Sequence, residues 1–384
     1  AGDSIATEDQ TLRLIAASDV ASEEGFGVSL NAIPLRSFLE AGANEPAWLA
    51  AARAQVPHML ALRSPVYEIK TRGKAPEAVV LNVALPSGSN TNPDLLDLYA
   101  YDSESNRWHF VPARVAGTTL EATLPSAPER LALFQTAPNA PVVLVAYDVT
   151  QFLSEEAGTL ATIVAPGGLQ PTLDGKITGS LAPGFVNNAG YLVMPVLRDY
   201  ADPRALDTQT VSAILSNSAL RTAHAREIAL LASGGGFDGI FIDYRGLAPD
   251  QRANFSTFIQ ELSRNLKSIG LLLGVVLPAP QNNQGVWDTG AYDWRSIGAA
   301  ADYVQINLDT NPQTFQPGET QPVEAMLRWA KGEISRYKIL LGLTALSVRE
   351  LAGNFTSIGY DAALAGLGDV RITDRKSTRL NSSH

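Results

Sequence analysis

The sequence predicts an α/β protein, a (β/α)8 TIM-like barrel preceded by a β-sandwich-like domain. After about residue 140, short apolar runs alternate with helical patterns, which is typical of a parallel sheet with crossover helices. Before that point, short β-like segments recur between turn sequences, which is typical of an antiparallel sandwich. We therefore expect a β-rich N-terminal module over residues 1–138 and a barrel over residues 139–373.

Composition places the chain among globular proteins and excludes several kinds of partner. Its 384 residues are 45% hydrophobic and 18% charged, which suits two domains with cores. The formal net charge of −10 argues against nucleic acid or an anionic membrane surface as the main partner. The chain has no cysteine, four scattered histidines and no apolar run of transmembrane length. We expect no disulfide, metal site, cofactor or transmembrane segment, and nothing in the sequence indicates an oligomeric state.

Neither end of the sequence looks like a native terminus. The chain begins at Ala1 without Met or a signal-peptide pattern, which suggests a mature or truncated product. Residues 374–384 are polar and charged and show no periodicity, so we interpret them as a non-native tail. On this interpretation the barrel is incomplete at its C-terminal end.

The N-terminal module shows one helical pattern followed by regularly spaced strands. Trp48–Leu62 is rich in Ala and Leu and predicts a helix. Strands are predicted at 77–85, 95–101, 107–113, 118–124 and 130–135, separated by turns such as Pro86–Asn90. Trp108, Tyr99 and Tyr101 could pack in the core or form a face on which a sugar ring stacks, and both interpretations stay open.

A Pro-rich linker at 137–141 separates this module from the barrel region. There the predicted parallel strands are 142–146, 191–197, 238–243, 271–277, 303–308 and 338–343. The predicted helices are 211–231, 249–269, 293–300 and 323–335. The helix at 249–269 has the clearest apolar face, with Pro249 near its first turn and Gly270 after its end. Residues 150–189, punctuated by Gly and Pro, are expected to lie outside the barrel wall.

The stretch from Gly234 to Gly246 is the most informative for function. Three glycines lead into an apolar run that contains Phe241, and Asp243, Tyr244 and Arg245 follow where the strand should end. Barrel enzymes keep their chemistry at the carboxyl ends of the parallel strands. The alternative to a functional role is that Asp238 and Asp243 only cap a core strand.

This stretch resembles the signature of glycoside hydrolase family 18, which contains chitinases and peptidoglycan hydrolases. The family pattern is D-G-x-D-x-D-x-E, and Asp238, Gly239 and Asp243 fit it as D-G-x-x-x-D. The resemblance implies a barrel fold, with the last Asp holding the substrate N-acetyl group and the Glu acting as general acid. Phe241 stands in place of the middle Asp, and Arg245 stands in place of the catalytic Glu.

A second family element is also changed. The family carries M-x-Y-D at the end of its sixth strand, where the Tyr contacts the N-acetyl group. The corresponding residues here are Asn307-Leu308-Asp309-Thr310. Two parts of the substrate-assisted site are therefore absent together, as expected if the site has changed its role.

Polar residues at four predicted strand ends should converge on one mouth. Carboxylates, amides and aromatic rings suit sugars, because hydroxyl groups need acceptors and ring faces need apolar surfaces. The alternative is that these groups only pair with one another, for example Arg245 with Asp243 or Asp238. The candidate catalytic residues are Asp243 and, more weakly, Asp238. The candidate substrate-binding residues are Tyr147, Asp148, Arg198, Asp199, Tyr244, Arg245, Asn307 and Asp309.

We therefore expect a carbohydrate-active, family 18-like protein that binds an N-acetylglucosamine-containing glycan, of the chitin or peptidoglycan type, without efficient substrate-assisted hydrolysis. One alternative is an active glycoside hydrolase with a rearranged Asp pair, whose carboxyl separation would indicate retention or inversion. Another is a structural envelope module. The resemblance to enzymes of polymeric glycans implies an extracellular or cell-envelope location.

Overall fold

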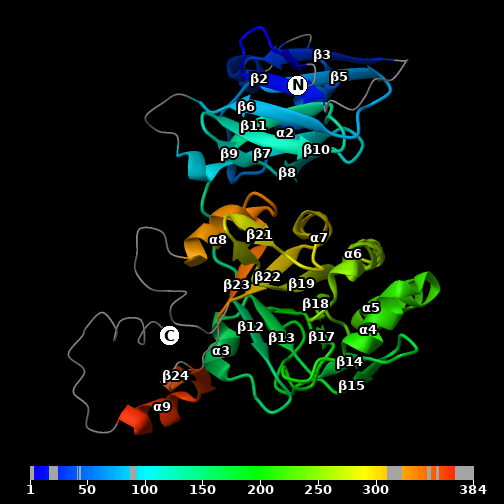
Figure 1. The fold of residues 1–384 in the computed structure, drawn as a ribbon, viewed down its shortest axis with the longest axis vertical. Coiled ribbons are helices and arrows are strands. Elements are labelled where there is room, and N and C mark those ends of the chain that lie inside the picture. The colour runs from blue at the N-terminus through cyan, green and yellow to red at the C-terminus, as the bar shows by residue number, and fades with distance from the viewer. Residues whose placement is uncertain are drawn as a thin grey trace. The chain divides into compact units, whose positions relative to one another are not determined.

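The computed structural model describes residues 4–16, 25–40, 42, 45–86, 92–308, 322–343, 347–351 and 354–367. The chain divides into two compact units, which are visible in Figure 1. The N-terminal unit comprises Ala1–Pro141 together with Arg328–Tyr337, and the C-terminal unit comprises Val142–Leu327 together with Lys338–His384. Residues 328–337, which we expected in the barrel, group with the N-terminal unit.

The N-terminal unit is built from two antiparallel sheets. The first contains, in spatial order, β1 (Ser4–Ala6), β2 (Leu12–Ala16), β6 (Val79–Ala84), β10 (Thr119–Leu124) and β9 (Arg114–Ala116). The second contains β3 (Phe26–Ile33), β5 (Val66–Gly73), β11 (Arg130–Thr136), β7 (Leu96–Asp102) and β8 (Arg107–Val111), with β4 (Leu60–Leu62) paired to β11. Alternate side chains of both sheets share one buried core, to which Leu14 and Leu81 come from the first sheet and Leu98 and Leu133 from the second.

Two short helices, α1 (Leu35–Leu39) and α2 (Ala47–Ala54), also belong to this unit. The predicted helix 48–62 is wrong in its second half, because the chain turns at Pro57 and continues as strand β4. Trp108, Tyr99 and Tyr101 are 4–7% exposed and lie in an aromatic core. The indole N–H of Trp108 donates to the Ala52 carbonyl. Core packing, not a sugar-stacking face, is therefore their role.

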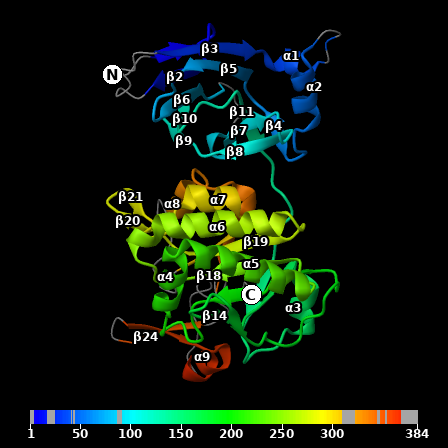
Figure 2. The ribbon, with the colours of Figure 1, turned by 90° about the vertical axis from the view of Figure 1, so that its right-hand side faces the viewer.

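The C-terminal unit contains a parallel wall of strands in two hydrogen-bonded sheets (Figures 1 and 2). The smaller sheet has the order β12 (Leu144–Tyr147), β13 (Ile163–Pro166) and β16 (Leu192–Val193). The larger has the order β15 (Ile177–Gly179), β14 (Leu169–Pro171), β17 (Val196–Arg198), β18 (Gly239–Asp243), β19 (Leu272–Pro278), β22 (Tyr303–Asn307) and β23 (Ile339–Gly342). All their pairings are parallel except that of β15 with β14.

The structure corrects two expectations about this wall. The six predicted strands do not share one sheet, because the predicted strand 191–197 divides at Met194–Pro195 into β16 and β17. The segment 150–189 is not wholly outside the wall, since it contributes β13 and β14. These strands are short and separated by Gly167 and Gly168, which explains why the sequence pattern concealed them. A closed barrel stays a prediction.

Helices cover the outer face of the wall, and hairpins extend from it. Figure 2 shows α4, α5 and α6 side by side, with α5 against β18 and α6 against β19. The helices are α3 (Glu155–Leu160), α4 (Thr208–Ser216), α5 (Ser218–Gly234), α6 (Arg252–Lys267), α7 (Trp294–Ala300), α8 (Pro322–Ala330) and α9 (Tyr360–Leu367). The hairpins are β20 (Gln281–Asn283) with β21 (Val286–Asp288), and β24 (Ser347–Leu351) with β25 (Asn354–Ile358).

One predicted helix is two helices. The segment 211–231 is interrupted at Asn217, whose side-chain oxygen accepts hydrogen bonds from the backbone N–H groups of Ala219 and Leu220, both at 3.1 Å. This is an N-cap, and it starts α5 in a new direction directly after α4.

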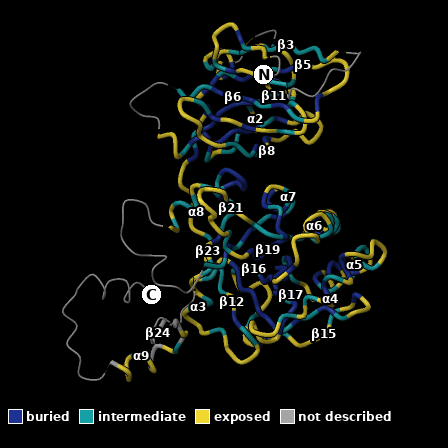
Figure 3. The backbone as a smooth tube through the Cα atoms, in the orientation of Figure 1, coloured by how far each residue is buried: buried dark blue, intermediate teal, exposed yellow. Residues whose placement is uncertain are grey.

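The inner face of the wall carries one apolar cluster, formed by side chains from its successive strands. Its buried members are Ile163, Ala165, Met194, Val196, Phe241, Val276 and Leu340. Figure 3 shows the strands of this wall as largely buried, while the helices around them are partly exposed. Because side chains alternate along a strand, residues two positions beyond these members point to the same inner face.

Candidate functional site

Alternation along the strands decides which predicted site residues can meet. Val196 pairs with Phe241 in the inner cluster, and two residues later Arg198 pairs with Asp243. Gln305 pairs with Leu340 of the same cluster, which places Gln305 and then Asn307 on the inner face. The carboxyl end of the inner face thus carries Arg198, Asp243, Gln305 and Asn307.

Consecutive residues cannot share a face of a strand, so some of the predicted residues lie elsewhere. Tyr147 packs with Val164 and Ala182 in a separate cluster. The side chain of Tyr244 is fully buried and contacts His224 of α5 on the outer face. The structure therefore contradicts direct ligand contact by the Tyr244 side chain, and it places Tyr147 away from the inner face.

Asp243 is held by an arginine clamp. The Arg245 Nε and Nη2 atoms donate to the two oxygens of Asp243, each at 2.7 Å. The hydroxyl of Tyr200 donates to Oδ2 of the same carboxylate at 2.6 Å. Asp243 is 3% exposed, and the bidentate pair with Arg245 keeps the pKa of that guanidinium raised against the opposing effect of burial. Asp243 thus accepts three hydrogen bonds, two from Arg245 and one from Tyr200.

A second ion pair lies beside the first. Arg198 Nη1 donates to Asp148 Oδ2 at 3.0 Å. The ring of Tyr200 lies near both guanidinium groups, with its centroid 5.7 Å from the Arg198 carbon and 4.7 Å from that of Arg245. A Cβ at Gly167 would approach Arg198 Nη2 to 2.9 Å, so the absence of a side chain there leaves room for the guanidinium. Two carboxylates and two guanidinium groups are thus paired within the site.

Asp199 is the carboxylate with unused hydrogen-bonding capacity. It is 1% exposed, and its Oδ1 accepts the backbone N–H of Arg245 at 3.0 Å. Its Oδ2 is buried and has no hydrogen-bond partner among the described residues. Burial, and secondarily the negative charge of Asp243, raise the pKa of Asp199 to about 6.

This raised pKa gives a pH-dependent stability with a definite sign. The folded chain binds the Asp199 proton more tightly than the unfolded chain, so its contribution is fully present below pH 3.8 and is lost as pH rises through about 6. A difference of about 2 pKa units corresponds to about 3 kcal/mol. Between pH 4 and pH 7 we expect the wild type to lose up to that much more unfolding free energy than Asp199→Asn, measured by urea denaturation. Parallel pH profiles of the two proteins would contradict the raised pKa.

Behind the site, a buried polar chain ties β18 to its surroundings. The His224 ring contacts the Gly175 carbonyl through Nδ1 at 2.6 Å and the Tyr244 hydroxyl through Nε2 at 2.7 Å. Burial lowers the pKa of His224, so the ring is neutral. This network assigns the proton to Nδ1, which donates to Gly175, and Nε2 then accepts from Tyr244. The rings of His224, Tyr244 and Phe258 are stacked.

Tyr244→Phe should therefore destabilise the fold. It leaves the buried Nε2 atom of His224 without its donor, which typically costs about 1–3 kcal/mol. Tyr303→Phe is the matched control, because no hydrogen bond of the Tyr303 hydroxyl is seen among the described residues. Urea denaturation of both variants measures the difference, and equal losses would show that the His224 contact contributes nothing.

A pair of amides completes the inner rim. Gln305 Nε2 donates to Asn307 Oδ1 at 2.7 Å, and both side chains are half-buried. A Cβ at Gly342 on the neighbouring strand would lie 2.6 Å from Asn307 Oδ1 and 2.9 Å from Gln305 Nε2. The other donor and acceptor atoms of this pair make no hydrogen bond within the part of the chain that the structure describes. They can serve a hydroxyl or amide group of a ligand.

The remaining two candidates are Asp238 and Asp309. Asp238 lies at the opposite, amino end of β18, where its carboxylate accepts the Val193 N–H at 2.8 Å. A five-residue strand spans about 16 Å, so a catalytic role beside Asp243 is contradicted. Asp309 lies outside the described residues.

Sequence reasoning missed three residues of this region. Tyr200 and Gln305 lie two positions from Arg198 and Asn307, and the period of two in a strand could have identified them. His224 is distant in sequence and gave no signal. Within the described ranges, no group of three or more His, Cys, Asp or Glu side chains is placed to hold a metal ion. Among the helices of those same ranges, none is long and apolar enough to cross a membrane.

Comparisons with known proteins support the family 18-like fold. The chain is 28% identical over 145 residues to the uncharacterized glycosylase YvbX of Bacillus subtilis (strain 168), a match that covers 36% of this chain and 42% of that protein. It is 25% identical over 138 residues to a cortical fragment-lytic enzyme of Bacillus cereus, covering 34% and 31%. The relatives are thus glycosylases and lytic enzymes, which supports the family 18-like fold expected from the motif.

The extent of these matches is limited. The chain spans less than half the length of the curated relatives it matches. A class V chitinase structure from Pseudomonas fluorescens Pf-5 is 22% identical with a TM-score of 0.49, covering 59% of this chain and 75% of that one. No protein-family model matches the chain.

Proposed function

We propose that this chain binds an N-acetylglucosamine-containing glycan, of the chitin or peptidoglycan type, without cleaving it by the substrate-assisted route. The observation that carries this proposal is the clamp of Arg245 on Asp243. A substrate-assisted glycosidase needs a protonated acid at the position that Arg245 occupies. A guanidinium stays charged near neutral pH and cannot fill that role.

The rest of the inner rim suits sugar binding. Asp148, Arg198, Gln305 and Asn307 are half-buried and offer donors and acceptors, and the Tyr200 ring lies near both arginines. Sugars are neutral molecules with many hydroxyl groups, and a site whose charges are already paired favours such a ligand over an ion. The relatives named above, a glycosylase and a cortical fragment-lytic enzyme, support a glycan ligand, and we propose an extracellular or cell-envelope location.

One observation favours a second candidate, a glycosidase with a rearranged carboxylate pair. Asp199 has a free, buried oxygen and a pKa of about 6, which are properties of a general acid. Against this candidate, Asp199 comes directly after the end of β17 and is only 1% exposed, so its free oxygen is covered.

Glycan binding can be tested directly. The protein would be titrated with N-acetylglucosamine oligomers and with glucose oligomers of the same length, in wild-type form and as Asn307→Leu. Gln281→Leu, on the exposed hairpin strand β20, is the control. We expect wild-type binding of the acetylated oligomers, weakened about tenfold or more by Asn307→Leu, because losing a good hydrogen bond to a ligand is worth about 1–3 kcal/mol. Absence of binding to either series would contradict the proposed function.

A further inference from the structure

The N-terminal unit includes a segment that belongs, by sequence, to the other half of the chain. Arg328–Tyr337, called here the docking segment, follows most of α8 and precedes β23. It groups with residues 1–141 and not with the strand and helix that flank it in sequence. Its residues Ala330 and Ile334 are fully buried.

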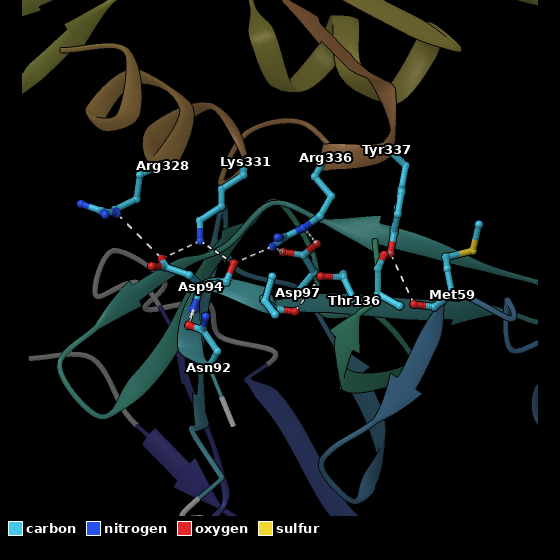
Figure 4. A network of polar contacts seen from close by, with 11 residues as sticks. Met59, Asn92, Asp94, Asp97, Thr136, Arg328, Lys331, Arg336 and Tyr337 are labelled. Atoms are coloured by element: carbon cyan, nitrogen blue, oxygen red, sulfur yellow. Dashed lines mark hydrogen bonds and ion pairs between the residues drawn. The ribbon is translucent and has the colours of Figure 1, made fainter. Parts of the chain in front are cut away.

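The docking segment is held mainly by two aspartates, Asp94 shortly before β7 and Asp97 within it (Figure 4). Arg336 Nε and Nη2 donate to the two oxygens of Asp97, at 2.8 and 2.7 Å. Asp97 is 5% exposed, so this bidentate pair is desolvated. Lys331 Nζ donates to Asp94 Oδ1 at 2.8 Å and to the Asp94 carbonyl at 2.7 Å.

Further contacts lie on both sides of these two pairs. Arg336 also reaches the Asp94 carbonyl at 3.0 Å, and Arg328 lies 3.8 Å from Asp94 Oδ1. One further pair has its charges reversed, since Arg114 of β9 supplies the cation and the buried Glu333 of the docking segment supplies the anion. The Tyr337 hydroxyl donates to the Ala137 carbonyl at 2.8 Å, and its ring packs against the aromatic core of the unit.

We propose that residues 1–141 form a docking surface for a basic amphipathic segment, and that the docking segment of this chain fills it. The acidic surface needs cations because Asp97 would otherwise be buried as an unpaired charge. The segment supplies Arg328, Lys331 and Arg336, together with the apolar Ala330 and Ile334. The β-rich module is therefore not a detachable accessory joined only through residues 137–141. It is completed by a segment from the second half of the chain.

Cutting the linker in the intact protein tests this proposal. A protease site would be inserted between Asn139 and Ala140, both of which are exposed, and the folded chain would be cleaved there. The cut protein should then run as one species on a gel-filtration column, because the docking segment remains in place. Separation of the two fragments without denaturant would overturn the proposal.

Variants show whether the docking segment is what holds the fragments. Arg336→Gln should let the cut fragments separate under conditions in which the wild-type fragments stay together. If this variant does not fold, Arg328→Ala with Lys331→Ala removes only pairs to Asp94 and should lower the urea concentration at which the cut fragments separate. Arg226→Ala, an exposed arginine on α5, is the control and should change nothing. Variants that separate no more readily than this control would overturn the proposal.

Discussion

Arg245→Ala should destabilise the C-terminal unit by about 3–5 kcal/mol, because it leaves Asp243 as a buried carboxylate without its cation. Tyr200 would remain as the other donor to Asp243, and one neutral hydroxyl cannot replace two charge-assisted hydrogen bonds. Urea denaturation at pH 7 measures the loss.

Two further variants give this prediction its controls. Arg245→Lys keeps the positive charge but not the planar guanidinium group. It should therefore lose some unfolding free energy relative to wild type, but less than Arg245→Ala loses. Arg226→Ala removes an exposed arginine for which no ion pair is seen among the described residues, and it should stay within about 0.5 kcal/mol of wild type. A loss for Arg245→Ala no larger than that of Arg226→Ala would show that the clamp contributes nothing to stability.

The second large effect is expected at Phe241, which replaces the middle Asp of the family motif. Its ring is fully buried in the inner cluster and lies over Gly274, where a Cβ would approach the ring to 2.3 Å. Phe241→Ala should cost about 3–5 kcal/mol through lost burial and a residual cavity. Phe241→Asp should cost more, because it adds a buried charge with no cation provided for it.

A double-mutant cycle tests whether the ring and Gly274 are complementary. Gly274→Ala alone should be strongly destabilising, since the new methyl group meets the ring. In the Phe241→Ala background the same methyl group enters vacated space, so Gly274→Ala should there be neutral or stabilising. Additive losses in urea denaturation would contradict this packing.

Several features of the fold could be predicted from sequence because their signals are local. The apolar run before Asp243 and the helical face from Phe255 to Leu266 correspond to β18 and α6. The missed features depend on longer-range or opposing signals. Strands β13 and β14 are too short and too rich in Gly and Pro neighbours to show a period. The apolar pattern of α4 continues after Asn217 into α5. The break between the two helices is therefore seen only in the side chain of Asn217, which caps α5.

The candidate site was predictable in content but not in orientation. Arg198, Asp243 and Asn307 are the last residues of β17, β18 and β22, at the carboxyl end of the wall. Side chains alternate between the two faces of a strand, so Asp243 lies on the inner face while Tyr244 contacts His224 behind it. Arg245 pairs with Asp243, one of the two carboxylates that the sequence offers as its partner. The docking of residues 328–337 onto the N-terminal unit carried no local signal.

The most direct test of the central claim is to measure binding and turnover of N-acetylglucosamine oligomers on the same wild-type sample. General acid catalysis typically contributes about 10²–10⁴-fold, so with Arg245 in place of the acid we predict binding with no turnover above the background rate. We also predict that Asp243→Asn leaves that absence of turnover unchanged. Robust hydrolysis by the wild type that survives Asp243→Asn would contradict the account and direct attention to Asp148, Asp199 and Asp309.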